Sequence, residues 1–75
     1  MSGWIPQNAD YLVNGYDAQG NILVGTWHIG EASRDMEIGA WKARYERGDK
    51  VARVDVIDRN TGKMESYPPW PDRPL

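Results

Sequence analysis

The chain of 75 residues contains no cysteine and no phenylalanine, and it has a single histidine. Without cysteine there can be no disulfide, no thiolate metal site and no thiol nucleophile, so stability must come from packing or from association. Nine basic and eleven acidic side chains leave a formal charge of -2, which is too even a balance for general attraction to nucleic acid.

Long hydrophobic segments are also missing. No run of about 18 apolar residues is present for a membrane span, and residues 1–10 lack the basic start and apolar stretch of a signal peptide. We therefore expect a cytoplasmic protein.

The chain has room for only one core, because a domain of this size hides only about 60% of the surface that its unfolded form exposes. Apolar residues make up 40% of the sequence, including four Trp and four Tyr, so the chain should fold. We expect one domain over residues 1–67 and a proline-rich tail over residues 68–75.

Two β-prone segments interrupted by turn residues predict two hairpins, over residues 11–29 and 51–67. Their turns are expected at Asp17–Gly20 and Asp58–Gly62. In each turn the aspartate can accept hydrogen bonds from backbone amides, and the closing glycine can adopt a positive φ.

Between the hairpins, residues 31–47 are rich in helix formers, with acids at the start and bases at the end. Ser33 or Gly30 is the expected N-cap, and Gly48 is the expected stop. The sequence thus predicts an α+β domain of ββαββ order, with a four-stranded antiparallel sheet of two hairpins and one helix packed on one face.

The predicted helix has two apolar stripes on roughly opposite sides. One stripe is formed by small residues and a methionine: Ala32, Met36, Gly39, Ala40 and Ala43. The other is larger and aromatic: Ile38, Trp41 and Tyr45. One face of a sheet covers only one stripe, so the other would be covered by the ends of the chain or by a second copy.

The second predicted strand does not alternate, because Ile22, Leu23 and Val24 are all apolar. It is therefore expected at the centre of the sheet or at a subunit contact. Gly25 would leave space there for a neighbouring Trp or for backbone.

The third predicted strand does alternate, with apolar residues at Ala52, Val54 and Val56. Arg53 and Asp55 fall on the other face, which is expected to be wet. Their expected cross-strand partners are Lys63 and Glu65 on the fourth strand.

Candidates for chemistry are few. His28 has no second His and no Cys with which to form a metal site, and no nucleophile motif accompanies it. Asp55, Asp58 and Glu65 do not have the spacing of a calcium loop, and Asp58 belongs to a turn. We expect no enzymatic activity, no metal and no cofactor. A carboxylate beside His28 in a closed pocket would reverse that expectation.

A basic set surrounds the end of the predicted helix: Lys42, Arg44, Arg47, Lys50 and Arg53. Together with nearby aromatic residues, such a set could hold a phosphate backbone while the aromatics stack on bases. Basic residues at a helix C-terminus are also expected from the helix dipole alone. An accessory nucleic-acid-binding role is therefore the alternative function.

The tail from Tyr67 to Arg73 fits the apolar-Pro-x-apolar-Pro-x-basic pattern of peptides that bind SH3-type domains. We prefer a tail that folds back and packs Trp70 on the sheet or on a partner subunit. Near the other end, Trp4 lies close to Pro6, and it is expected to meet a partner if Trp70 does not.

The aromatic residues give the preferred function. Trp and Tyr are enriched at binding hot spots, although they also fill cores. We expect a non-catalytic small protein-interaction module, self-associating as a homodimer or binding another protein. Its expected contact residues are Trp27, Trp41, Tyr45 and Trp70.

Overall fold

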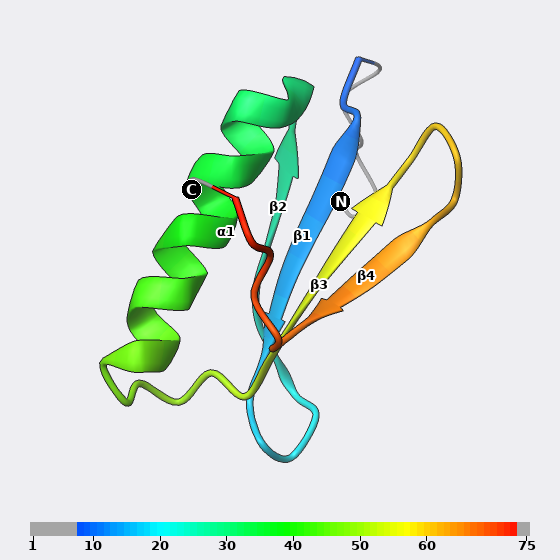
Figure 1. Ribbon diagram of the computed structural model, residues 1–75. Coiled ribbons are helices and arrows are strands. Elements are labelled where there is room, and N and C mark those ends of the chain that lie inside the picture. Colours follow the sequence, from blue (N-terminus) through cyan, green and yellow to red (C-terminus); the bar gives the residue numbers. More distant parts are fainter. Residues whose placement is uncertain (1–7, 74–75) are drawn as a thin grey trace.

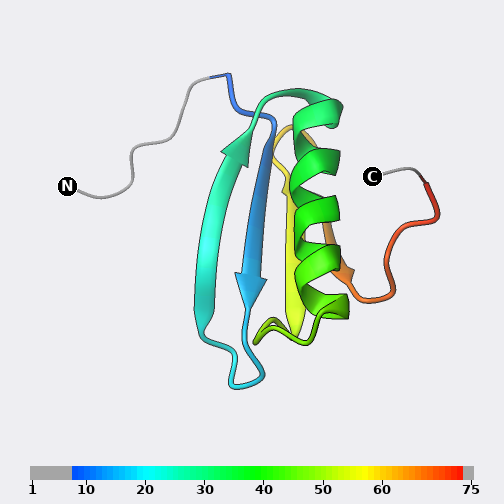
Figure 2. The same ribbon diagram turned by 90° about the vertical axis from the view of Figure 1, so that its left-hand side faces the viewer.

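A computed structural model describes residues 8–73, so the prediction for Trp4 lies outside the described residues. The elements in chain order are β1 (Tyr11–Tyr16), β2 (Ile22–His28), α1 (Gly30–Glu46), β3 (Arg53–Asp58) and β4 (Met64–Tyr67). The predicted α+β fold is confirmed. One antiparallel sheet has the strand order β2-β1-β3-β4, and α1 lies against one face of it (Figures 1 and 2). Within residues 8–73, no helix is long and apolar enough to cross a membrane.

Both predicted turns are confirmed in their chemistry. The Asp17 carboxylate accepts hydrogen bonds from the backbone N–H groups of Gln19 and Asn21, at 3.0 and 2.9 Å. The Asp58 carboxylate likewise accepts hydrogen bonds from the backbone N–H groups of Asn60 and Thr61. Gly20 and Gly62 close these turns with φ of 86° and 78°, a conformation that costs glycine little.

The helix ends as predicted but begins differently. The Gly48 N–H donates to the Tyr45 carbonyl and the Asp49 N–H to the Arg44 carbonyl, which is the Schellman arrangement. At the other end no side chain of the helix caps it. Instead the Gly30 N–H donates to the Asp10 carboxylate at 2.9 Å, so the predicted cap at Ser33 or Gly30 is wrong. The cap comes from 20 residues away, which local sequence does not reveal.

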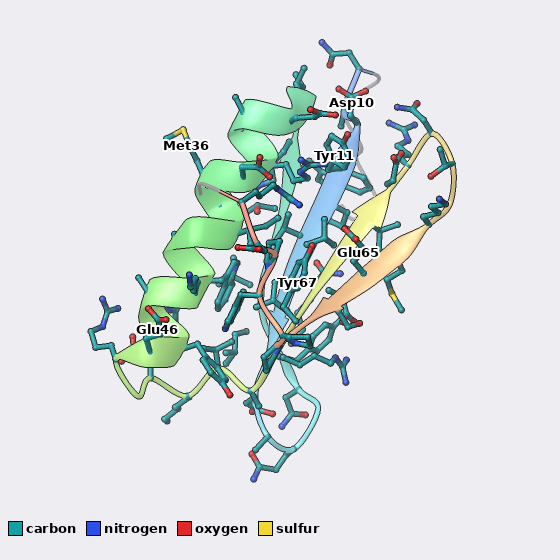
Figure 3. The ribbon with its side chains drawn as sticks, viewed as in Figure 1. Asp10, Tyr11, Met36, Glu46, Glu65 and Tyr67 are labelled. Carbon is teal, nitrogen blue, oxygen red and sulfur yellow. The ribbon has the colours of Figure 1, made fainter. Side chains whose placement is uncertain are left out.

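The core lies between the aromatic stripe of α1 and the sheet. Ile38 and Trp41 are buried, and they meet Val13, Val54 and Val56 from the two central strands together with three further residues, Val51, Tyr67 and the partly buried Leu23. The small-residue stripe therefore faces away from the sheet. Met36, at its centre, is 75% exposed and projects away from the fold (Figure 3).

The central position predicted for the second strand is wrong, because β2 is an edge strand. A β-bulge accounts for its run of apolar residues. The register between β1 and β2 shifts after Gly15, so that Gly15 pairs with Val24 but Tyr16 pairs with Ile22. This bulge interrupts the alternation and lets Leu23 reach the core.

The approach of a Trp ring predicted at Gly25 occurs at Gly15 instead. A Cβ added to Gly15 would lie 2.3 Å from the Trp41 ring, so the ring rests directly on the backbone of β1. At Gly25 the space is filled by the side chain of Asn14, 2.4 Å from an added Cβ.

Candidate functional site

The four aromatic residues predicted to contact a partner do not form one surface. Trp41 is 2% exposed and belongs to the core, with the Arg44 guanidinium 4.5 Å from its ring centre. Tyr45 and Trp70 lie together on the helix side of the sheet. Trp27 lies on the opposite face, because it pairs with Leu12 and not with the core residue Val13. Only three of the four are thus accessible to a partner, and they face in two directions.

The tail folds back from the end of β4 and runs beside α1 (Figure 1). The Trp70 ring stacks on Tyr67 with centroids 5.6 Å apart, and it meets Tyr45 edge-on at 5.5 Å. The aromatic residue and the basic residue of the SH3-ligand pattern are thus both engaged within the chain, because Arg73 pairs with Asp35 at 3.0 Å.

Asp35 holds this tail by electrostatics. It accepts hydrogen bonds from Arg34 at 2.9 Å and from Arg73 at 3.0 Å. Partial burial alone would raise the pKa of the Asp35 carboxyl, but the two guanidinium groups outweigh it, so the pKa lies below the ordinary value of 3.8. The carboxylate is therefore charged throughout the neutral range.

The sheet face opposite α1, called the open face below, carries large side chains. The helix covers only one side of the sheet (Figure 2), and strand register assigns the residues of the other side. Its apolar and aromatic members are Leu12, Tyr16, Ile22, Trp27, Ile57 and Met64. Ile22 and Met64, at opposite edges, are 57% and 59% exposed. The guanidinium groups of Arg53 and Arg59 lie 4.3 and 5.9 Å from the ring centres of Tyr16 and Trp27.

The centre of the open face is polar and yet buried. Asn14 and Asp55 pair across β1 and β3, and they are only 9% and 6% exposed. Asp55 accepts a hydrogen bond from the Ser66 hydroxyl at 2.7 Å, and Arg53 lies 3.2 Å away. The predicted wet face with Lys63 or Glu65 as partner is therefore wrong at Asp55. The strand register places Ser66 opposite Asp55, and the alternation of side chains turns Lys63 and Glu65 to the helix side.

His28 contacts two hydroxyl groups. Its Nε2 lies 2.7 Å from the Thr26 Oγ1, and its Nδ1 lies 2.8 Å from the Ser33 Oγ. The imidazole thus ties the end of β2 to the first turns of α1. Both ring nitrogens are used by hydroxyls, so no carboxylate orients this ring as a general base would require. No cluster of three or more metal-ligating side chains occurs in the part of the chain that the structure describes.

A shallow cavity of about 280 Å³ lies on the helix side of the sheet, where α1 leaves β3 and β4 uncovered. Its polar lining includes Tyr11, Arg34, Asp58 and Glu65, and Val56, Lys63 and the edge residue Met64 also border it. Tyr11 and Glu65 are seen on this side in Figure 3. Three of the lining groups are engaged with neighbours: Arg34 with Asp35, Asp58 with its turn, and Glu65 with the Tyr67 hydroxyl. The cavity is separate from His28.

The predicted basic set is divided among several environments. Arg44 and Arg47 both pair with Asp49, at 3.7 and 2.7 Å. The Arg47 hydrogen bond holds the pKa of Asp49 below its ordinary value. Arg53 lies on the open face with Tyr16 and Asp55. Of the other two members, Lys42 lies within α1 and Lys50 lies in the loop between α1 and β3.

The sequence interpretation missed most of the open face. Trp27 was named, but Tyr16, Met64 and Arg59 were not. The alternation of side chains in β1 could have indicated Tyr16. Leu12, Asn14 and Tyr16 point to one face of the strand, and the buried Val13 points to the other.

The chain matches no family model, and no significant match was found among curated proteins or among solved structures.

Proposed function

We propose that this chain is a non-catalytic protein-interaction module that associates with a copy of itself and presents the open face of its sheet to a partner protein. The observation that carries the proposal is the composition of that face. Aromatic residues, Met and Arg are enriched at the centres of protein interfaces, whereas Lys, Glu, Asp, Ser and Ala are depleted. The Asp and the Ser of the open face, Asp55 and Ser66, are hydrogen-bonded to each other. Among the described residues, the open face has Tyr16, Trp27, Met64 and two arginines, and it has neither Lys nor Glu.

The buried polar centre supports the same proposal. Polar side chains of a sheet face are normally solvated when nothing covers the face, whereas Asn14 and Asp55 are nearly inaccessible. Asp55 has its partners in place already. A partner that covered this face would therefore desolvate little further charge there, which lowers the cost of binding.

The two exposed methionines of α1 and β4 allow a direct test. Met64 lies on the open face, and Met36 lies on the opposite side of the molecule at the centre of the small-residue stripe. Photo-methionine can be incorporated at both positions, and the protein then irradiated in a lysate of its source cells. Trypsin separates the two sites, because Met36 falls in the peptide of residues 35–42 and Met64 in that of residues 64–75.

We expect protein adducts at Met64 and few at Met36. Unlabelled wild-type chain should compete for the adducts, and so should the Met36→Lys variant, whereas Met64→Lys should not. Adducts that form mainly at Met36 would contradict the proposal. So would adducts at Met64 for which the unlabelled Met64→Lys variant competes as well as unlabelled wild type does.

A further inference from the structure

The two edges of the sheet differ in how well they are protected against pairing. Edge strands expose unpaired backbone groups, and proteins guard them with short length, charge or proline. β4 has four residues, includes Glu65, follows Lys63 and runs directly into Pro68. β2 has seven residues, Ile22–His28, and contains no Asp, Glu, Lys, Arg or Pro.

Apolar side chains flank the unguarded edge on both faces. Ile22 belongs to the open face, and Val24 lies on the helix side because it pairs with Gly15, against which Trp41 packs. They are 57% and 46% exposed. Within residues 8–73 no strand pairs with the outer edge of β2. In Figure 2, β2 is the leftmost strand and α1 lies to the right of it, so the helix does not run along the outer edge of β2.

We propose that two copies of the chain pair through the outer edges of their β2 strands, antiparallel and about a two-fold axis, to form one continuous sheet. This inference rests on the self-association in the proposed function and names the contact that carries it.

The charge of β2 is compatible with a second copy as its partner. Antiparallel pairing about a two-fold axis brings each residue opposite one of the same segment, so a charged strand would oppose its own charges. β2 has no permanent charge to oppose. With the axis at Gly25, Val24 of each copy would stand opposite Thr26 of the other, a pair of β-branched residues that suits a sheet.

The pairing would also extend the open face. Trp27 and Ile22 lie on β2, so the open faces of the two copies would join along the axis. The unguarded edge is thereby removed, which also removes the risk of uncontrolled aggregation that it carries.

Hydrogen exchange measured by NMR at increasing protein concentration tests the edge directly. In an edge strand, every second amide points away from the neighbouring strand. We expect the outward amides of β2 to become at least tenfold better protected as the dimer forms, while the outward amides of β4 do not change. Equal behaviour of the two edges, or no change in β2, would overturn the inference.

Two lysine variants give the matched mutational test. Val24→Lys places a charge diagonally across the proposed axis from the same charge of the other copy. Met36→Lys places the same charge on the exposed helix stripe. By sedimentation we expect Val24→Lys to weaken dimerisation at least tenfold and Met36→Lys to leave it within a factor of two. Both residues are well exposed, and circular dichroism checks that both variants fold.

The outcomes separate this inference from the proposed function. A wild-type dimer that Val24→Lys does not weaken refutes pairing at β2 but leaves binding by the open face intact. Dimers through β2 without adducts at Met64 would support the edge contact and refute the open face as the partner surface.

Discussion

Replacement of Gly15 by alanine tests the packing that defines the two faces of the sheet. An added Cβ would lie 2.3 to 2.5 Å from three atoms of the Trp41 ring, whereas carbon atoms in contact are about 3.5–4.0 Å apart. The ring would have to move by more than about 1 Å. It has little room to move, because Trp41 is buried with Ile38 and Val54 in the same core.

The expected loss is large for so small a domain. Overpacking of a core typically costs about 1–3 kcal/mol, and an overlap of this size with a rigid ring belongs at the upper end. A domain of this length has about 4–11 kcal/mol of total stability. We therefore expect Gly15→Ala to lower the free energy of unfolding by about 3 kcal/mol.

Urea denaturation followed by tryptophan fluorescence measures this loss, which should lower the midpoint by at least about 1 M. Gly20→Ala is the matched control, since nothing lies within 4 Å of its added Cβ and only its positive φ of 86° is penalised, by about 1–2 kcal/mol. In combination with Trp41→Phe, Gly15→Ala should cost less than it does alone, because the smaller ring relieves the overlap. If Gly15→Ala is within about 0.5 kcal/mol of wild type, the reasoning about this contact is refuted.

Three further predictions concern the helix cap, the tail and the alternative function. Asp10→Ala removes the acceptor of the Gly30 N–H and should lower the free energy of unfolding by about 1 kcal/mol, as for a lost N-cap; an unchanged urea midpoint would contradict this. Because the pKa of Asp35 is depressed, its contribution is present above the ordinary carboxyl pKa and is lost as the pH falls through the folded value. The indole NMR signal of Trp70 should therefore report release of the tail in acid, and Asp35→Asn should release it at neutral pH; a tail that stays docked in that variant would refute the role of Asp35. Finally, the divided basic set should give no retention of single- or double-stranded DNA at about 50 mM salt, where phosphate contacts are strong, and clear salt-dependent binding would favour the nucleic-acid alternative.

Local chemistry was enough to predict the secondary structure of this protein. The turn aspartates Asp17 and Asp58 act on amides within four residues of themselves, so their role can be inferred from sequence alone. The helix stop at Gly48 is local in the same sense. The remote cap from Asp10 is not local, because the contact depends on how β1 and α1 meet.

Strand order and the assignment of faces depended on long-range packing. Val54 and Val56 were assigned correctly to the dry side because β3 alternates regularly. β2 was misplaced because a bulge next to Gly15 interrupts its alternation, and a run of apolar residues is also typical of a strand buried on both faces. The placement of the helix decides whether the Trp41 ring packs on Gly15 or on Gly25. The sequence around these two glycines does not indicate where the helix lies.

The candidate site was the least predictable part. Trp27, Trp41, Tyr45 and Trp70 share a chemistry that suits both cores and interfaces. The structure separates them: Trp41 fills the core, Tyr45 packs against Trp70 of the tail, and Trp27 lies on the open face. That separation follows only from the three-dimensional arrangement.

Sedimentation equilibrium of the wild-type protein, from about 10 µM to about 1 mM, tests the central claim of self-association most directly. The account predicts a mass that rises with concentration from that of the 8.5 kDa chain toward twice that value. A mass that stays at 8.5 kDa over the whole range would contradict it.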